Sequence, residues 1–337
     1  AEVSFDDTLR EVCMVFFFTS VGFQANLKVL KSGGKSLVVF LGLVIGLILC
    51  QNFLAVGMSK VLNLDPLIGL CTGSIPMVGG HGTAGAFGPV LEEAGVAGAN
   101  AVAIASATFG LVAGCMIGGP LAYRRIHSLN LKSTETATGS DEVTVDKNEV
   151  TGAIDSRRFL DSALYLAIAI GAGTIVSLFL NKLMTFPSYI GAMVVAAIIR
   201  NIVDATHKDM PMEEISTIGS FSLSLFLGLA MMGLKLWQLA ELALPMIVML
   251  AAQTVLMAIF AYFVVFNLLG KNYDAAVMTS GFCGFGMGAT PNAMANMQAI
   301  TSKYGPAPTA YFVVPLVGSL FIDFFNALII TTFMNFL

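Results

Sequence analysis

Residues 66–91 read PLIGLCTGSIPMVGGHGTAGAFGPVL, an uncharged stretch with seven glycines. A second uncharged stretch, residues 275–302, contains GFGMG at 284–288 followed directly by ATPN. Glycine at this density destabilises a continuous helix. Broken backbone at membrane depth is tolerated only where protein buries it or a water-filled cavity meets it. Both stretches are therefore predicted to form helix–loop–helix hairpins that re-enter the membrane.

The composition of the chain indicates an integral membrane protein. The 337 residues are 56% hydrophobic and 11% charged, with a mean hydropathy of +0.84. A soluble domain carries about 25% charged residues, so soluble enzymes and secreted disulfide scaffolds are excluded. The net charge of −4 offers no basic surface to nucleic acid. The five cysteines all lie in apolar runs without metal-ligand spacing, which favours a role as core filler.

Outside the two glycine-rich stretches, the apolar runs have the length of membrane spans. A transmembrane helix needs roughly 20 apolar residues, whereas a barrel strand needs only about 10 with alternating polarity. The chain is therefore predicted to be an all-α polytopic membrane protein. The expected spans are residues 12–27, 36–59, 94–123, 162–181, 183–199, 215–234, 242–270 and 309–336.

The order of spans and hairpins repeats with an offset of about 210 residues. Residues 16–27 and 226–236 are similar, and each is followed by a long span, an aspartate, a glycine-rich stretch and a further span. Five spans separate the two hairpins, so the hairpins enter from opposite faces. Inverted repeats with broken helices meeting near the midplane are typical of secondary transporters. Re-entrant hairpins also place 13 Lys and Arg on one face and 4 on the other, against 11 and 6 if both stretches crossed fully.

The repeat divides the chain into two halves, residues 1–122 and 159–337, joined by a charged cytoplasmic linker at residues 123–158. The second half holds five spans and the first only three, the unmatched pair being residues 159–181 and 187–202. We therefore expect two further spans before Ala1. Asp65 and Asp274 stand at the starts of the hairpins and are predicted to cap helices.

Each hairpin directs a helix N-terminus into the membrane interior. Thr83, after GGHG at residues 79–82, and Thr290, after Gly288 and before Pro291, are predicted N-caps. A helix N-terminus carries unpaired N–H groups and a positive partial charge, so it binds anions without an arginine. The alternative is a pair of structural kinks that bind nothing, with both threonines serving as caps alone.

Asp323 lies inside the last apolar span, with Asn326 on the same helix face. A carboxylate at membrane depth costs at least about 2.5 kcal/mol, so it usually meets a partner or a transport pathway. Its oxygens, with those of Asn326 and Thr290, suit a hard cation such as sodium. The alternative is a polar brace between helices.

Three further polar residues of the hairpins are candidates for substrate contact. Asn292 and Asn296 share one helix face and could bind the substrate, or could join helices to each other. His81 could donate to a carboxylate, although a hydrogen bond to loop backbone is favoured.

The chain closely resembles the bacterial sodium/glutamate symporter family over nearly its whole length. The resemblance rests on LDPLIGLCTGSIPMVGGHGT from Leu64, SLSLFLGLAMMGLKLW from Ser222, GKNYDAAV from Gly270, GFGMGATPNAMANMQAIT from Gly284 and PLVGSLFIDFFNAL from Pro315. The segment GGHGT fits the re-entrant signature of the family. The second loop departs from it, because Phe285 stands where a second glycine is expected.

The resemblance implies ten spans, two re-entrant hairpins, a homodimer in the bacterial inner membrane and sodium-driven uptake of L-glutamate, without an organic cofactor. The residues of the two loops themselves give the predicted substrate contacts, namely Gly80, His81, Gly82, Thr83, Gly288, Thr290, Pro291, Asn292 and Asn296.

Other functions are less well supported by the residues. An intramembrane protease would need a catalytic motif, and the chain has neither G-x-S-x-G nor G-x-G-D. A channel would conduct without saturable, ion-coupled flux. A sodium- or proton-coupled di- or tricarboxylate symporter is the main alternative, since its substrates also suit helix N-termini.

Overall fold

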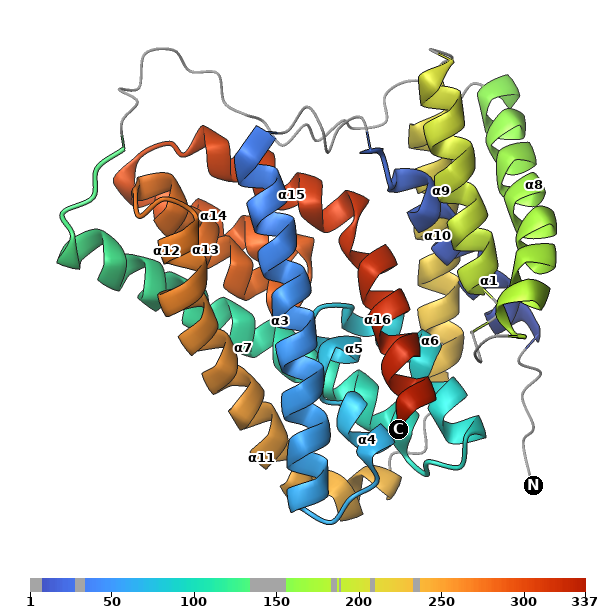
Figure 1. The fold of residues 1–337 in the computed structure, drawn as a ribbon, viewed down its shortest axis with the longest axis horizontal. Coiled ribbons are helices and arrows are strands. Elements are labelled where there is room, and N and C mark those ends of the chain that lie inside the picture. Colours follow the sequence, from blue (N-terminus) through green and yellow to red (C-terminus); the bar gives the residue numbers. More distant parts are fainter. Residues whose placement is uncertain are drawn as a thin grey trace.

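The computed structural model describes residues 8–27, 34–133, 156–182, 187, 189–206, 210–232 and 237–337. Every regular element in these ranges is a helix, as the all-α prediction requires (Figure 1). Five of the described helices are long and apolar enough to cross a membrane, and a bent pair at the C-terminus makes a sixth candidate. The protein is a multi-pass membrane protein.

The expected spans are confirmed as helices, with ends up to six residues from those predicted, and the last of them is bent by 46° between two helices. Longer helices result where polar residues cap or extend an apolar run. They are α1 (Thr8–Gln24), α3 (Gly34–Val61), α7 (Ala99–Ser128), α8 (Ser156–Leu180), α9 (Tyr189–Ala205), α10 (Met212–Met232), α11 (Trp237–Ile259) with the π-helix η1 (Phe260–Val265) and α12 (Phe266–Leu268), and α15 (Pro308–Leu320) with α16 (Ile322–Phe336). Helix thus covers both ends of the predicted linker, and residues 134–155 lie outside the described residues.

Both glycine-rich stretches are broken helices, as predicted. The first, hairpin 1, comprises α4 (Pro66–Leu70), α5 (Ser74–Met77) and α6 (Gly80–Glu93). The second, hairpin 2, comprises α13 (Tyr273–Gly286) and α14 (Thr290–Tyr304). Figure 1 shows α4 at the lower end of α3 and α13 beside α12 at the upper end of α11, so the hairpins start from opposite ends of the molecule.

The caps at the starts of the hairpins follow from their sequences. Asp65 caps α4, its carboxylate accepting a hydrogen bond from Leu67 N at 2.8 Å, which confirms its predicted role. The cap of α13 is Asn272, which accepts from Ala275 N at 2.8 Å. Asp274 instead lies in the first turn of α13, where its negative charge interacts favourably with the positive end of the helix dipole.

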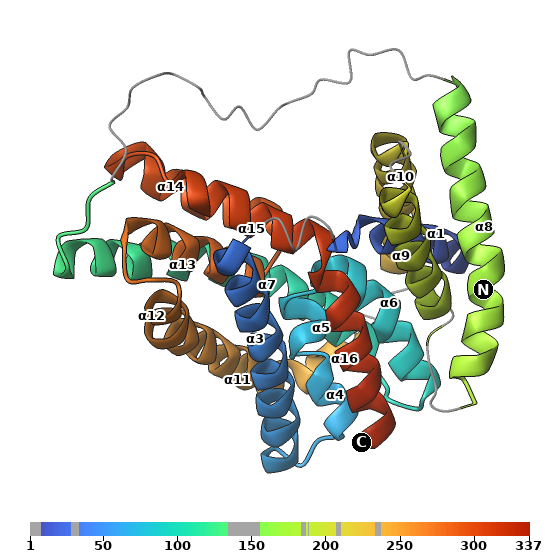
Figure 2. The same ribbon diagram turned by 45° about the horizontal axis from the view of Figure 1, so that its top comes forward.

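The helices form two groups, which the turned view in Figure 2 separates clearly. Helices α1, α8, α9 and α10 pack on one another at one side of the molecule, and we call them the side bundle. Close approach within it depends on small residues, for example Gly22 of α1 against the backbone of Met193 of α9. The other group surrounds both hairpins with α3, α7, α11, α15 and α16, and its buried side chains form the largest apolar core.

Candidate functional site

The two helix breaks meet in the interior of the molecule. Gly80 begins α6 with a φ of +58°, which favours glycine, and a Cβ built on it would lie 3.1 Å from Gly288 O. The backbone of the GGHG segment therefore touches the backbone that precedes α14. This contact brings the predicted residues of the two loops into one place.

Both inward-pointing helix N-termini lack a side-chain cap. Gly79 caps α6 and Ala289 caps α14, and neither position provides a side-chain hydrogen bond. The predicted caps are therefore wrong: Thr83 lies one turn inside α6, and Thr290 is the first residue of α14. The left-handed turn at Gly80 starts α6 before Thr83, and no side chain fits at position 79 beside the Thr83 side chain. The first-turn N–H groups of both helices consequently stay available to an anion.

His81 contacts a helix outside its own hairpin. Its Nε2 lies 3.0 Å from Thr108 Oγ1 of α7, which replaces the expected bond to loop backbone. His81 is half-buried and Thr108 is exposed, although both residues come from the interior of apolar segments. This pair therefore lies at an accessible point beside the start of α6.

The two asparagines of α14 attach hairpin 2 to α7. Asn292 Nδ2 donates to Leu111 O at 3.0 Å. Asn296 Nδ2 donates to Gly114 O at 3.0 Å and to Ser280 O at 3.2 Å. The amide nitrogens thus join helices, which was the alternative to substrate binding for both residues.

A stripe of glycines on α7 forms the seat for hairpin 2. Gly110 contacts Met287 O, and a Cβ on Gly114 would lie 2.9 Å from Cys283 O. A Cβ on Gly118 would lie 2.8 Å from Ser280 O. The spacing G-x-x-x-G-x-x-x-G, which signals close packing between membrane helices, would have revealed this seat in the sequence.

The candidate cation ligands lie around a bend in the last span. The axes of α15 and α16 differ by 46°, and Asp323 follows the bend in the first turn of α16. Asp323 is half-buried and forms no ion pair with any residue in the described part of the chain. Thr290 Oγ1 lies against Gly318, just before the bend, where a Cβ would approach it to 2.7 Å.

Asn326 connects the same helix to hairpin 1. Its Nδ2 donates to Ser74 O at 3.1 Å, so its Oδ1 points away from that bond. Asn326 Oδ1 and Ser74 Oγ are both buried without a hydrogen-bond partner among the described residues. Asn326 of α16 therefore contacts hairpin 1, and Thr290 of hairpin 2 lies against Gly318 of α15. Asp323 lies three residues before Asn326 on α16.

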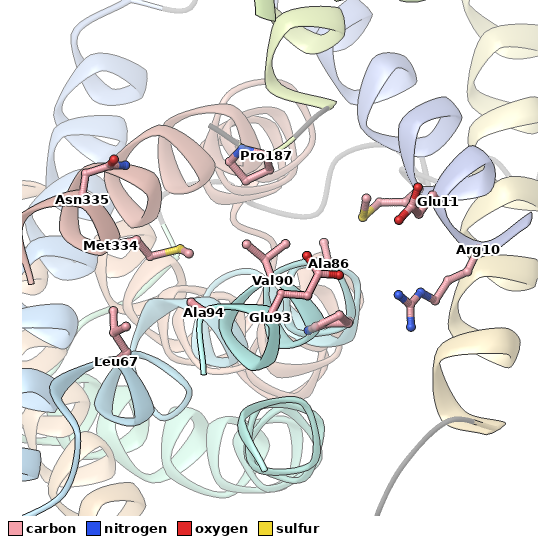
Figure 3. Close-up of a pocket in the computed structure, with 13 residues that line it drawn as sticks. Arg10, Glu11, Leu67, Ala86, Val90, Glu93, Ala94, Pro187, Met334 and Asn335 are labelled. Carbon is pink, nitrogen blue, oxygen red and sulfur yellow. The ribbon is translucent and has the colours of Figure 1, made fainter. Parts of the chain in front are cut away.

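A cavity of about 590 Å³ lies beside hairpin 1, away from the meeting point of the loops. Figure 3 shows Ala86, Val90 and Glu93 of α6 between Arg10 and Glu11 of α1 on one side and Met334 of α16 on the other. The cavity begins within one turn of Thr83 but is lined by none of the predicted site residues. The cavity therefore lies outside the predicted site.

The side bundle covers hairpin 1 but leaves part of hairpin 2 open. A Cβ on Gly82 would contact Phe17 and Leu223 of the bundle at 3.4 Å. On hairpin 2, by contrast, Pro291, Ala295 and Gln298 form an exposed face along α14. The first turns of α14 are therefore accessible from the exposed face of this helix.

Cysteine labelling should reach the two loops from opposite sides of the membrane. In a chain without its five native cysteines, we expect Ala295→Cys and His81→Cys to react with a membrane-impermeant maleimide added to opposite faces. Both side chains are at least partly accessible, whereas the control Ala84→Cys is fully buried and should not react. The assay is run without sodium and substrate to hold one state. Labelling of both positions from the same face would contradict the inverted arrangement.

Comparison with known proteins identifies the family. A family model described as the sodium/glutamate symporter matches residues 1–306. The sodium/glutamate symporters of Escherichia coli (strain K12) and of Shigella flexneri are each 44% identical to this chain over 340 residues, which is 99% of this chain and 84% of theirs. That of Haemophilus influenzae is 38% identical over 332 residues, 96% of this chain and 81% of its own. No solved structure is significantly similar to the chain. The chain belongs to the sodium/glutamate symporter family.

Proposed function

We propose that this protein is a secondary transporter that couples sodium entry to the uptake of L-glutamate. The observation that carries the proposal is the meeting of two uncapped helix N-termini, at Gly80 and after Gly288, in a member of this family. Glutamate is an anion with two carboxylates. Two positive helix ends that face one site supply N–H donors for such a ligand without a buried lysine or arginine.

Each hairpin contributes a set of donors to the proposed glutamate site. From hairpin 1 they are the backbone N–H groups of Gly80, His81 and Gly82 and the hydroxyl of Thr83. The His81 ring, bonded to Thr108 on α7, borders the site.

From hairpin 2 come Gly288, whose lack of a side chain lets the loops meet, and the first turn of α14. In that turn Thr290 and Asn292 offer N–H groups, while Pro291 fixes the helical start without one. Asn292 and Asn296 position this helix on α7 through their amide nitrogens.

The proposed sodium ion binds between α16 and the hairpins, with Asp323, Asn326 and Thr290 as ligands. Two observations support this assignment. Asn326 Oδ1 and the neighbouring Ser74 Oγ are buried acceptors without partners among the described residues, which a hard cation would satisfy. Asp323 brings a negative charge that no described ion pair neutralises.

Coupling follows from the charges of the two ligands. A cation near Asp323 and an anion at the helix N-termini attract each other strongly in a low-dielectric interior. Each ligand therefore raises the affinity for the other, and by thermodynamic linkage the effect is reciprocal. When the site opens alternately to the two faces of the membrane, sodium and glutamate are therefore carried across together.

The setting of the protein follows from the same proposal. Uptake of glutamate by a bacterium places it in the inner membrane, with hairpin 1 entering from outside and hairpin 2 from the cytoplasm. We further propose that it works as a homodimer. Five exposed apolar side chains on α8, Leu160, Leu164, Ile168, Ile175 and Leu178, leave ample surface for lipid or for a second copy.

Counterflow in proteoliposomes tests the function directly. We expect radiolabelled glutamate to exchange when sodium is present, and the exchange to stop when choline replaces sodium. Excess unlabelled glutamate should compete fully, aspartate partly and citrate hardly. Equal competition by citrate would indicate the di- or tricarboxylate symporter instead, and exchange without sodium would contradict sodium coupling.

A further inference from the structure

Two buried glutamines lie together at the end of the first arm of hairpin 2. Gln51 of α3 and Gln253 of α11 are 0% and 1% exposed. Gln51 Nε2 donates to Gly286 O at 2.8 Å, and Gln253 Nε2 donates to Gln51 O at 2.9 Å. Each amide nitrogen is therefore held by a backbone carbonyl, and this fixes the direction of the amide oxygen.

The two amide oxygens are the unusual part of this arrangement. Gln51 Oε1 and Gln253 Oε1 have no hydrogen-bond partner among the described residues. A buried acceptor without a partner loses its hydrogen bonds to water, and no protein hydrogen bond compensates the lost free energy. Native structures therefore contain few such acceptors. Two such acceptors on residues joined by the bond from Gln253 Nε2 to the Gln51 carbonyl point to a ligand that binds oxygen atoms.

The surrounding backbone adds a negative potential. Gly286 is the last residue of α13, and a helix C-terminus carries a negative partial charge from its unpaired carbonyls. Gly286 is enclosed by Leu47 of α3 and by Met257 of α11, at 2.5 Å and 2.9 Å from where its Cβ would lie. These are apolar neighbours one turn from Gln51 and Gln253. The two amide nitrogens here both donate to backbone carbonyls, which leaves the two amide oxygens as the free polar groups in an apolar enclosure.

We propose that Gln51 Oε1 and Gln253 Oε1 bind a second sodium ion at the C-terminal end of α13. The proposed function enters this inference at one point only, the choice of sodium as the ion. Neutral oxygens and a helix C-terminus favour a monovalent cation, because divalent ions take carboxylate ligands. Broken helices in transporters offer their carbonyl ends to such cations.

This second site is separate from the one around Asp323. The next residue on α3, Asn52, turns to hairpin 1, where its Oδ1 accepts from Ser74 N at 2.9 Å. Ser74 also bonds Asn326 of α16. Helix α3 therefore contacts hairpin 2 through Gln51 and hairpin 1 through Asn52, and the two sets of free oxygens belong to different hairpins.

A cation at the end of α13 would act on substrate binding through the loop that follows. Residues 287–289 connect α13 directly to the uncapped start of α14. An ion that holds the Gly286 end in place fixes where the first N–H groups of α14 point. Sodium would then organise half of the glutamate site before glutamate arrives.

Sodium-dependent thermal stability, measured without glutamate, tests the second site. Purified protein carrying Asp323→Asn is titrated with sodium chloride, and choline chloride keeps the ionic strength constant. A ligand that binds only the folded state raises the melting temperature according to its concentration and affinity. We expect sodium still to raise the melting temperature of this variant, because the glutamine site remains.

Further substitutions in the same background then remove the two ligands. Gln51→Leu or Gln253→Met should raise the sodium concentration for half of the effect by about tenfold or more, since losing even an outer partner of a metal site costs about that much affinity. Gln51→Asn and Gln253→Asn keep the amide but draw its oxygen back by one methylene, so each should also raise that concentration. The control Thr254→Val removes the neighbouring hydroxyl, which bonds Leu250 O, and should change nothing.

Several outcomes would overturn the proposal. One is a complete loss of the sodium response in Asp323→Asn alone. Another is an unchanged response in Gln51→Leu and Gln253→Met, which would mean that the amide oxygens hold water only. If both apolar variants fail to fold, Gln51→Asn and Gln253→Asn take their place, and an unchanged response in both decides against the site. Because glutamate is absent throughout, a failure of the transport assay would leave this result intact, and the reverse also holds.

Discussion

Replacing Asp323 by asparagine should raise the sodium concentration for half-maximal glutamate transport by at least about tenfold, which corresponds to about 1.4 kcal/mol of binding free energy. The carboxylate stands at a bend in the last span, and no described residue forms an ion pair with it. A charge at such a depth is costly unless something compensates it. The measurement is sodium-dependent counterflow in proteoliposomes, with thermal unfolding of the same protein as a check on folding.

The comparison with a neighbouring residue separates an ion ligand from a structural brace. Thr331→Val on the same helix removes a fully buried hydroxyl that bonds Ala327 O at 2.8 Å. It should affect stability slightly and sodium dependence not at all. Glutamate binding by Asp323→Asn should recover in part at saturating sodium. Wild-type sodium dependence in a folded Asp323→Asn protein would mean that Asp323 only braces α16. If that variant does not fold, Asn326→Ala takes its place in the same assay.

Valine at position 118 should abolish transport, whereas valine at position 119 should leave it nearly intact. The side chain at Gly118 would meet Asn296 Nδ2 and would come within 2.8 Å of Ser280 O, so hairpin 2 could no longer rest on α7. Overpacking of this kind costs about 1–3 kcal/mol and sometimes more. Gly119 faces open space, with no atom within 4 Å of where its Cβ would lie.

The two valine variants form a matched pair, because they share a helix and a substitution. Position 119 precedes Pro120 within α7, so valine there carries an extra steric cost, and a larger loss in the position 118 variant is therefore a conservative result. Uptake by whole cells, with the amount of protein in the membrane measured alongside, reports the difference. Equal activity of the two variants would show that the seat on α7 does not determine the position of hairpin 2.

The sequence was sufficient for the features that depend on local composition. Uncharged runs such as residues 36–59 predicted their helices, and the glycines of GGHG and GFGMG predicted the breaks. The caps could not be predicted in this way. Threonine is a much better cap than alanine and about as good as glycine in isolation, but the contact between Gly80 and Gly288 decides where α6 starts.

Contacts between distant segments were beyond the reach of the sequence patterns. The residues around Asn292 and Asn296 do not show that their amide nitrogens donate to carbonyls of α7. Nor does the sequence around Gln51 show that its side chain bonds Gly286, 235 residues away. A polar side chain inside a long apolar run is nevertheless a signal in itself. Gln51 and Gln253 carry that signal, although neither was predicted from the sequence as a site residue.

Gly110 has a further consequence, because it contacts both hairpins at once. Met287 O of hairpin 2 lies against it, and the Met77 side chain of hairpin 1 would lie 3.3 Å from its Cβ. Close-packed interiors resist continuous deformation, so these three segments should behave as a single solid piece. A pair of spin labels on α6 and α14 should then report one constant separation through the whole cycle. Labels on α6 and α10 test whether the side bundle, which contacts α6 through Leu223 and Phe226, moves against this piece; at least two separations would place the movable joint there.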